Sequence, residues 1–223
     1  MKKQIIKSLG MIGLATAMFV GLVGTVNAVD GVKLITQARA MSGNVTLGDL
    51  PGFPVTISQS GSYRLASNLN LGTSGVSTTA IEIKDTGKLT VKVDLNGFLI
   101  GGTNVCDFNE QGDVECTTTG TGNGIETSDE SSVVITNGSI RGMGGNGINC
   151  LGSCTIEKLT IANNGGAGIR IPDSNMPSLV LQNKIAVNGS HGISTGKASI
   201  QSNVVKFNLG HGITTAFSTV VDK

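Results

Sequence analysis

The chain has 223 residues, of which 33 are glycine, 39% are hydrophobic and 14% are charged, and its formal net charge is +1. The hydrophobic share excludes a disordered chain, glycine without a three-residue period excludes collagen, and the missing basic stripe argues against a nucleic-acid partner. What remains is an all-β protein rich in turns, consistent with an aromatic content of only 3%.

The first 28 residues have the pattern of a secretory signal peptide. Three early lysines precede an apolar stretch, and Val26 and Ala28 are the small residues expected before a cleavage site. We expect cleavage after Ala28 and export to the periplasm or the outside of the cell, with an uncleaved membrane anchor as the alternative. No later stretch reaches the roughly 18 apolar residues of a membrane span, so none is expected in the mature chain.

Residues 29–62 precede the repeats that fill the rest of the chain. The segment 32–41 has weak helical spacing, and the first clear alternating pattern begins at Tyr63. Because a solenoid needs a cover over its first core layer, we interpret residues 29–62 as an N-terminal cap. Residues 63–223 are then the solenoid itself.

The solenoid prediction rests on a recurring Gly-Ile pair followed by a second apolar block. The spacing between successive pairs is 20–24 residues, and each repeat holds short segments with a period of two, which are too short for helices. The pairs are Gly124-Ile125, Gly147-Ile148, Gly168-Ile169, Gly192-Ile193 and Gly212-Ile213. We therefore predict an all-β, right-handed parallel β-helix of the single-stranded solenoid type, in which these isoleucines stack inward as one buried column.

Asparagine recurs in the turns of this predicted coil, at Asn163, Asn188 and Asn208. Asparagine tolerates turn conformations, and its side chain satisfies backbone groups that a bend leaves unpaired. We expect these three residues to stack along the coil.

A polar insertion at about 102–122 interrupts the repeats. Its cysteines, Cys106 and Cys116, lie 10 residues apart, and Cys150 and Cys154 enclose three residues further on. In an exported protein, local pairing is the simplest of the three possible disulfide connectivities. A four-cysteine zinc site is the alternative, although the spacing lacks a repeated C-x-x-C pair.

The insertion also carries oxygen-bearing side chains in a spacing that partly imitates a calcium loop. Asp107, Asn109 and Asp113 are the weak calcium candidates, but Thr118 stands where a bidentate glutamate is required. The simpler interpretation is a disulfide-closed, solvated loop. Apart from calcium, no cofactor or metal is expected.

The residue after each inward isoleucine points outward and forms a second column. Glu82 and Glu126 belong to it and are expected on adjacent turns, about 5 Å apart. Two carboxylates at this separation match a retaining glycosidase. The alternative is an outward column of solvated polar side chains that has no catalytic role.

Several strings resemble those of a known group of proteins. They are Pro51–Ile57, Gly61–Leu65, Asp94–Phe98 and Asn137–Gly142. With them the chain resembles the exported bacterial right-handed parallel β-helix repeat proteins of the pectin-lyase-like superfamily, over residues 45–215. The resemblance implies the fold and suggests polysaccharide-active relatives, but it does not specify an activity.

The resemblance adds three candidates for catalysis. Arg170, before Ile171 and Pro172, matches part of the arginine-proline motif of pectate lyases, without the second arginine. His191 and His211 each precede a Gly-Ile pair, in a pattern similar to the Gly-His-Gly of polygalacturonases. The acidic motifs that accompany this histidine are absent, so exposed turn residues are the alternative.

Two classes of function stay open, and the sequence does not decide whether the chain is an enzyme. The first is a secreted or periplasmic β-helix protein that binds glycan of the envelope or the surroundings. The second is a polysaccharide lyase, hydrolase or epimerase with a site on an outward face. The regular repeat near the C-terminus leaves two alternatives. Either the chain is shorter than its relatives, or it associates end to end through residues 198–221, because an open sheet edge invites pairing.

Overall fold

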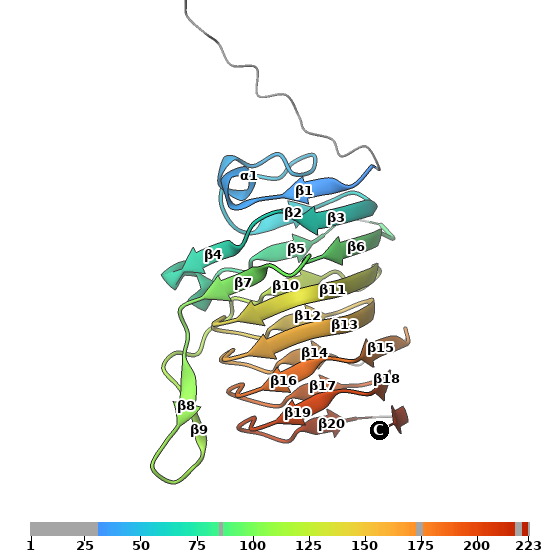
Figure 1. Ribbon diagram of the computed structural model, residues 1–223. Helices are drawn as coiled ribbons and strands as arrows, with labels where there is room; N and C mark the ends of the chain where they lie inside the picture. Colours follow the sequence, from blue (N-terminus) through green and yellow to red (C-terminus); the bar gives the residue numbers. More distant parts are fainter. Residues whose placement is uncertain (1–30, 85–86, 173–175, 217–219, 223) are drawn as a thin grey trace, which may run out of the picture.

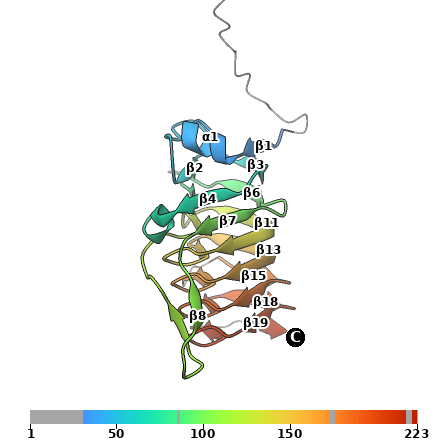
Figure 2. The ribbon, with the colours of Figure 1, turned by 60° about the vertical axis from the view of Figure 1, so that its left-hand side comes forward.

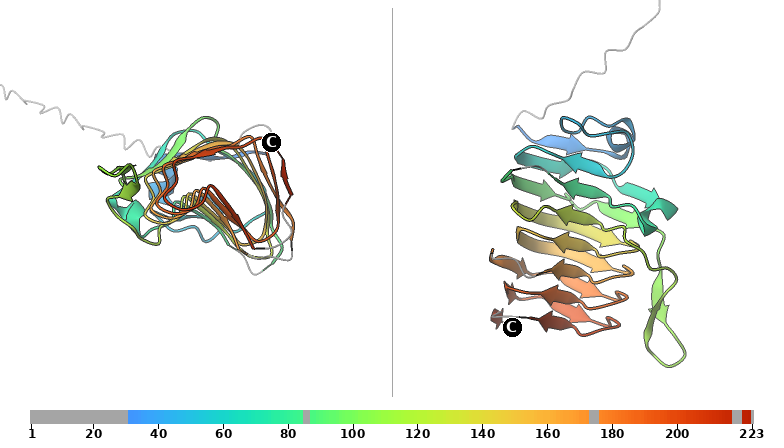
Figure 3. Two further views of the ribbon diagram at one scale, coloured as in Figure 1. Left: turned by 90° about the horizontal axis from the view of Figure 1, so that it is seen from below. Right: turned by 180° about the vertical axis from the view of Figure 1, so that it is seen from behind.

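The computed structural model describes residues 31–84, 87–172, 176–216 and 220–222. The expected signal peptide, residues 1–28, therefore lies outside the described residues. The chain winds into turns that stack along one axis (Figure 1). Viewed down that axis, successive turns follow nearly the same outline (Figure 3).

One face of the coil is a seven-stranded parallel sheet, which we call sheet B. In spatial order its strands are β2 (Val55–Ile57), β5 (Ile81–Ile83), β10 (Ile125–Thr127), β12 (Ile148–Cys150), β14 (Ile169–Ile171), β17 (Ile193–Thr195) and β20 (Ile213–Thr215). Each strand comes from one turn of the coil and pairs with the strands of the turns above and below. The predicted Gly-Ile segments from Ile125 to Ile213 are thus all strands of this sheet.

The other side of the coil is a twelve-stranded parallel sheet, sheet A, which bends into two limbs. The first limb contains β1 (Lys33–Ile35), β3 (Gly61–Leu65), β6 (Thr90–Asp94), β15 (Ser178–Leu181), β18 (Ala198–Gln201) and β21 (Val220–Asp222). The second limb contains β4 (Leu69–Gly72), β7 (Leu99–Gly102), β16 (Lys184–Ala186) and β19 (Val204–Lys206). The two ten-residue strands, β11 (Ser132–Arg141) and β13 (Ser153–Ala162), run through both limbs.

This arrangement confirms the predicted right-handed parallel β-helix. Its core is a stack of aliphatic side chains because alternate residues of each strand point inward. Ile125, Ile148, Ile169 and Ile193 form one column in direct register and are completely buried. Ile213 continues the column but is only half-buried, so the prediction that all five are buried is wrong for this last member. No described strand pairs with the outer edge of β20, the strand that contains Ile213.

The N-terminal end differs from the expected weak helix over residues 32–41. Lys33–Ile35 is strand β1, which pairs with β3, and the helix α1 (Gln37–Ser42) follows it. Thr36 begins the helix because its hydroxyl accepts a hydrogen bond from the Arg39 amide at 3.1 Å. Strands β1 and β2 show that residues 29–62 also contribute to the coil sheets, and their role as a cap stays a prediction.

The turns between limb two and sheet B contain an asparagine ladder. The side-chain amide of Asn164 donates to Asn188 at 3.0 Å, and that of Asn188 donates to Asn208 at 2.9 Å. The prediction that Asn163 belongs to this ladder was wrong by one residue, since Asn164 takes that place. Asn163 instead adopts a left-handed backbone conformation with φ of 58°. A second ladder, which the sequence did not reveal, joins Asn183 to Asn203 at 2.9 Å.

The predicted insertion forms an arm, which we define as residues 106–116. Its strands β8 (Cys106–Phe108) and β9 (Val114–Cys116) pair as an antiparallel hairpin. The arm leaves the coil after β7 and lies beside the later turns (Figures 1 and 2). The short 3-10 helix η1 (Thr73–Val76) lies beside the base of the arm, after β4.

The structure confirms local pairing of the cysteines. The sulfur atoms of Cys106 and Cys116 are 2.02 Å apart, and those of Cys150 and Cys154 are 1.93 Å apart. The first disulfide closes the arm, and the second closes the turn between β12 and β13. The four cysteines thus form two separate bridges, which rules out the four-cysteine zinc site.

Candidate functional site

The outward face of sheet B presents a continuous polar column. Each of its seven strands has an inward first residue, and the second residue points outward. The column consists of Thr56, Glu82, Glu126, Asn149, Arg170, Ser194 and Thr214. The register expected for Glu82 onward is therefore confirmed, and Thr56 extends the column by one turn. Every side chain in it can donate or accept a hydrogen bond.

Glu82 and Glu126 are direct neighbours in this column, on strands β5 and β10. Both side chains are half-buried. A carboxylate oxygen of Glu82 forms an ion pair with the Lys84 ammonium at 3.3 Å. A carboxylate oxygen of Glu126 accepts a hydrogen bond from the Asn123 side chain at 2.6 Å. Among the described residues, no hydrogen bond or ion pair uses the second oxygen of either carboxylate.

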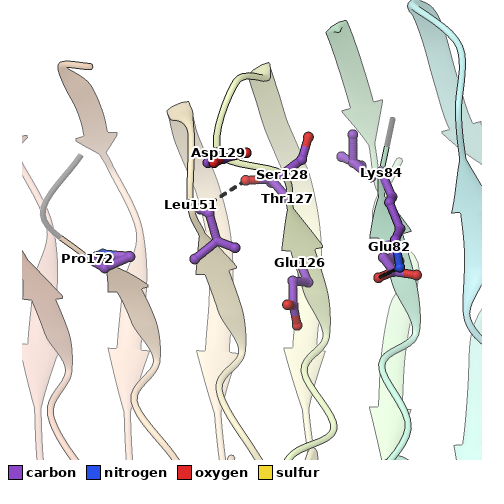
Figure 4. A pocket seen from close by; sticks show the side chains of 9 residues that line it. Glu82, Lys84, Glu126, Thr127, Ser128, Asp129, Leu151 and Pro172 are labelled. Atoms are coloured by element: carbon purple, nitrogen blue, oxygen red, sulfur yellow. Dashed lines mark hydrogen bonds and ion pairs between the residues drawn. The ribbon is translucent and has the colours of Figure 1, made fainter. Parts of the chain in front are cut away.

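These two glutamates border an open hollow of about 460 Å³ (Figure 4). Its wall is formed by the ends of β5 and β10 and by residues that follow β10, β12 and β14. The lining residues are Glu82, Ile83, Lys84, Glu126, Thr127, Ser128, Asp129, Leu151 and Pro172. Glu82 and Glu126 project from neighbouring strands on one side of it, while Asp129 lies on the turn after β10.

Asp129 is the carboxylate that our sequence prediction missed. It follows β10 directly, in the polar run Thr127–Glu130, and a polar turn at the end of a strand is the only sequence signal for it. The turn is anchored by the Thr127 hydroxyl, which accepts a hydrogen bond from the Leu151 amide at 3.0 Å. The hollow thus combines three carboxylates, one ammonium group and two half-buried apolar residues, Leu151 and Pro172.

Arg170 shares the column but is separate from the hollow. Asn149 lies between Glu126 and Arg170, and the Arg170 guanidinium donates to the Asn149 side-chain oxygen at 3.0 Å. The structure therefore brings the two glutamates together and places the arginine two strands away on the same face.

His191 and His211 form a stacked pair at the C-terminal end of the coil. Their rings are 5.5 Å apart between centroids and lie within 3° of parallel. The His211 backbone amide donates to Nδ1 of His191 at 3.0 Å. Neither histidine lines the hollow beside Glu82 and Glu126, so the structure does not join them to the carboxylates.

The calcium candidates lie on the arm, where other contacts already use some of their oxygens. The Asn109 side-chain oxygen accepts hydrogen bonds from the amides of Gln111 and Asp113, at 3.1 and 2.9 Å. Asp107 accepts from the Phe108 amide at 2.8 Å. Within the described part of the chain, no group of three or more histidine, cysteine or acidic side chains is arranged to hold a metal ion.

Comparison with known proteins agrees with the geometry of the coil. The family model described as "Right handed beta helix region" matches residues 69–221. The chain belongs to this right-handed β-helix family. No curated protein and no solved structure matches this chain. In the parts of the chain that are described, no helix is long and apolar enough to cross a membrane.

Proposed function

We propose that this β-helix protein binds a glycan along the outward face of sheet B. The observation that carries the proposal is the polar column itself: seven hydrogen-bonding side chains in direct register, one from each turn. Adjacent parallel strands are about 4.8 Å apart, so the column repeats hydrogen-bonding groups along the coil axis at that interval. A linear polymer with hydroxyl groups on each unit is the ligand class that such a row fits.

The members of the column supply complementary chemistry to sugar hydroxyls. The Thr56 and Ser194 hydroxyls can donate and accept, and the Glu126 carboxylate accepts, whereas Asn149 is buried and bonded to Arg170. The hollow beside Glu126 adds apolar edges from Leu151 and Pro172, against which a sugar ring can pack. Small-molecule sites commonly combine such apolar walls with a few directed polar groups.

The test is a binding screen of the mature protein against neutral, amino-bearing and acidic polysaccharides. The variant Glu126→Gln removes one charge from the column, while Glu157→Gln is the matched control on the outward face of sheet A. We expect Glu126→Gln to weaken the best-bound glycan at least fivefold and Glu157→Gln to leave it unchanged. Equal effects of the two variants, or no bound glycan in the panel, would overturn the proposal.

A second candidate function is hydrolysis of a glycosidic bond, favoured by the direct pairing of Glu82 and Glu126 in one hollow. In this scheme one carboxyl group protonates the leaving oxygen and the other attacks the sugar carbon, which requires groups about 5–5.5 Å apart. Release of new reducing ends from the bound glycan, abolished in both Glu82→Gln and Glu126→Gln, would support it. Binding of the glycan without release of any product would contradict hydrolysis and support only the binding function.

Export and the finer family placement are parts of the same proposal. The two disulfides are compatible with an oxidising compartment, and the predicted signal peptide at 1–28 would direct the chain there. The strings Asp94–Phe98 and Asn137–Gly142 support membership of the pectin-lyase-like superfamily of exported bacterial proteins. Sequencing the N-terminus of the secreted protein would test cleavage after Ala28.

End-to-end self-association through residues 198–221 stays a prediction. It is supported by large apolar side chains that are more than half exposed at this end of the coil, namely Val204, Phe207, Leu209, Val220 and Val221. Light scattering over a wide concentration range tests it. A monomer throughout would contradict it.

A further inference from the structure

The second limb of sheet A has a basic outward face. Arg141 ends β11, Lys184 begins β16 and Lys206 ends β19, and all three side chains are exposed. Arg141 and Lys184 point outward because their neighbours Ile140 and Ile185 are completely buried, and Lys206 does so because its neighbour Val205 packs against the core. We call these three residues the basic limb face.

Among the described residues, no ion pair uses a charge of this face. The strand segments of limb two, from β7 to β19, contain no acidic residue. Within the described residues, Arg141 and Lys184 form no ion pair, in contrast to Arg64, which pairs with Asp94 on limb one at 3.2 Å. The Lys206 ammonium lies 5.3 Å from the centre of the Phe207 ring, a contact that leaves its charge uncompensated.

The three cations lie along the coil axis, and the side chains between Arg141 and Lys206 in the same column are small alanines. In register, Arg141 is followed by Ala162, Ala186 and Lys206 on successive strands. Three strand steps separate Arg141 from Lys206, about 14 Å along the axis. Lys184 lies in the neighbouring column, paired with Thr160 and Val204. The alanines leave the face shallow, so a ligand can approach all three cations at once.

We propose that the basic limb face binds an anionic glycan that lies along the coil axis, on a surface separate from the polar column of sheet B. The argument is charge complementarity: a linear polymer with a negative group on each unit meets cations that are aligned in the same direction. This inference is independent of the sheet B proposal, because it uses different residues on another face.

A polymer fits this face better than an anionic bilayer does. Polybasic membrane contacts typically use four to eight basic residues, and amphipathic ones insert large apolar groups. Here three cations border the arm, since Phe108 of the arm contacts Phe207 beside Lys206, with ring centroids 5.6 Å apart. The arm exposes Asp107 and Glu115, so the charge on this side of the molecule is mixed, which disfavours a wide anionic bilayer more than a narrow polymer that follows the limb strands.

The test compares dextran sulfate with neutral dextran of the same length, which differ only in charge. We expect the mature protein to bind dextran sulfate, with affinity falling as salt increases, and not to bind neutral dextran through this face. The triple variant Arg141→Gln, Lys184→Gln, Lys206→Gln should lose about tenfold in affinity, since each exposed contact contributes a small part. Its melting temperature is measured alongside, to show that the coil is intact.

The matched control is the triple variant Lys88→Gln, Lys92→Gln, Lys197→Gln, which removes the same net charge from other parts of the surface. It should retain nearly the parental affinity. Equal losses in both triple variants would show a nonspecific charge effect and overturn the proposal. Binding of anionic phospholipid vesicles that depends on the same three residues, with no preference for dextran sulfate, would overturn the glycan assignment.

The triple variant of the basic limb face separates this inference from the proposed function. It should leave unchanged the binding of a neutral glycan found in the sheet B screen, because Arg141, Lys184 and Lys206 lie on sheet A. If the sheet B screen fails while the basic limb face still binds dextran sulfate, only the proposed function is lost. The reverse result removes only this inference.

Discussion

The two ends of the coil bury their side chains very differently. At the N-terminal end, Ile35, Val55 and Tyr63 are no more than 1% exposed. At the C-terminal end, Phe207 is 57% exposed and Ile213 is only half-buried. The strand pairing and residue pattern are the same at both ends. Among the described residues, the helix α1 adds the buried Ala40 at the N-terminal end, and no strand follows β20 in sheet B.

The helix α1 lies at the N-terminal end of the coil, where we expect the cap. The α1 helix adds Ala40, which is completely buried, and its carbonyl accepts a hydrogen bond from the Gly52 amide at 2.8 Å. In a repeat protein each layer is stabilised chiefly by its two neighbours. A layer with only one neighbour keeps the same register but buries much less apolar area, so identical substitutions at the two ends should differ in cost.

The largest expected effect comes from placing a charge in the isoleucine column. Ile169→Asp and Val55→Asp each bury a charge without a partner and should unfold the coil, at a cost of more than about 4 kcal/mol. Ile213→Asp can turn its carboxylate to water and should cost about 1 kcal/mol. Urea unfolding followed by circular dichroism measures all three. Near-parental stability of Ile169→Asp would contradict the register.

The asparagine ladder provides a second comparison between an interior and a terminal layer. Asn188 is completely buried, and its side chain bonds to both Asn164 and Asn208. Asn188→Ala leaves buried groups unpaired and should cost about 2–3 kcal/mol, whereas Asn208→Ala should cost about 1 kcal/mol or less. The midpoints of urea denaturation report both values. A ladder that served no structural purpose would give equal and small losses.

Alkaline pH tests the covered N-terminal end. Burial raises the pKa of the Tyr63 hydroxyl from 10.0 to about 12. Because the folded state binds this proton more tightly, its contribution to stability is complete below pH 10 and is lost as the pH rises toward 12, by at most about 2 kcal/mol. Tyr63 is the only tyrosine, so its absorbance follows the ionisation directly. The Tyr63→Phe variant should lack this step in the stability profile.

The smallest expected effect comes from removing one methylene group at each position. Ile169→Val leaves a small cavity in a completely buried layer and should cost about 0.5–1.5 kcal/mol. Ile213→Val should cost less than about 0.5 kcal/mol, since water reaches the half-buried layer. Thermal unfolding of the two variants measured side by side resolves the difference. A larger loss for Ile213→Val would mean that the C-terminal layer is covered in solution.

The sequence by itself determined the coil and the register of sheet B. The spacing of the Gly-Ile pairs places one isoleucine in each turn, and a period of two then sends the following residue outward. This was enough to predict that Glu82 and Glu126 are adjacent. The local pairing of the cysteines was predicted separately, as the simplest connectivity given the short separations within each pair. These features depend on neighbours along the chain or on the strict repeat.

Only the tertiary structure decided which residues from different periods or insertions meet. The left-handed turn at Asn163 shifts the ladder to Asn164, because the exact bend in each turn depends on packing against its neighbours. The contact of Phe108 with Phe207 joins the arm to a turn 99 residues later, and no repeat pattern predicts where an insertion docks. The basic limb face likewise requires the fold of limb two, since stacking alone brings Arg141, Lys184 and Lys206 onto one surface.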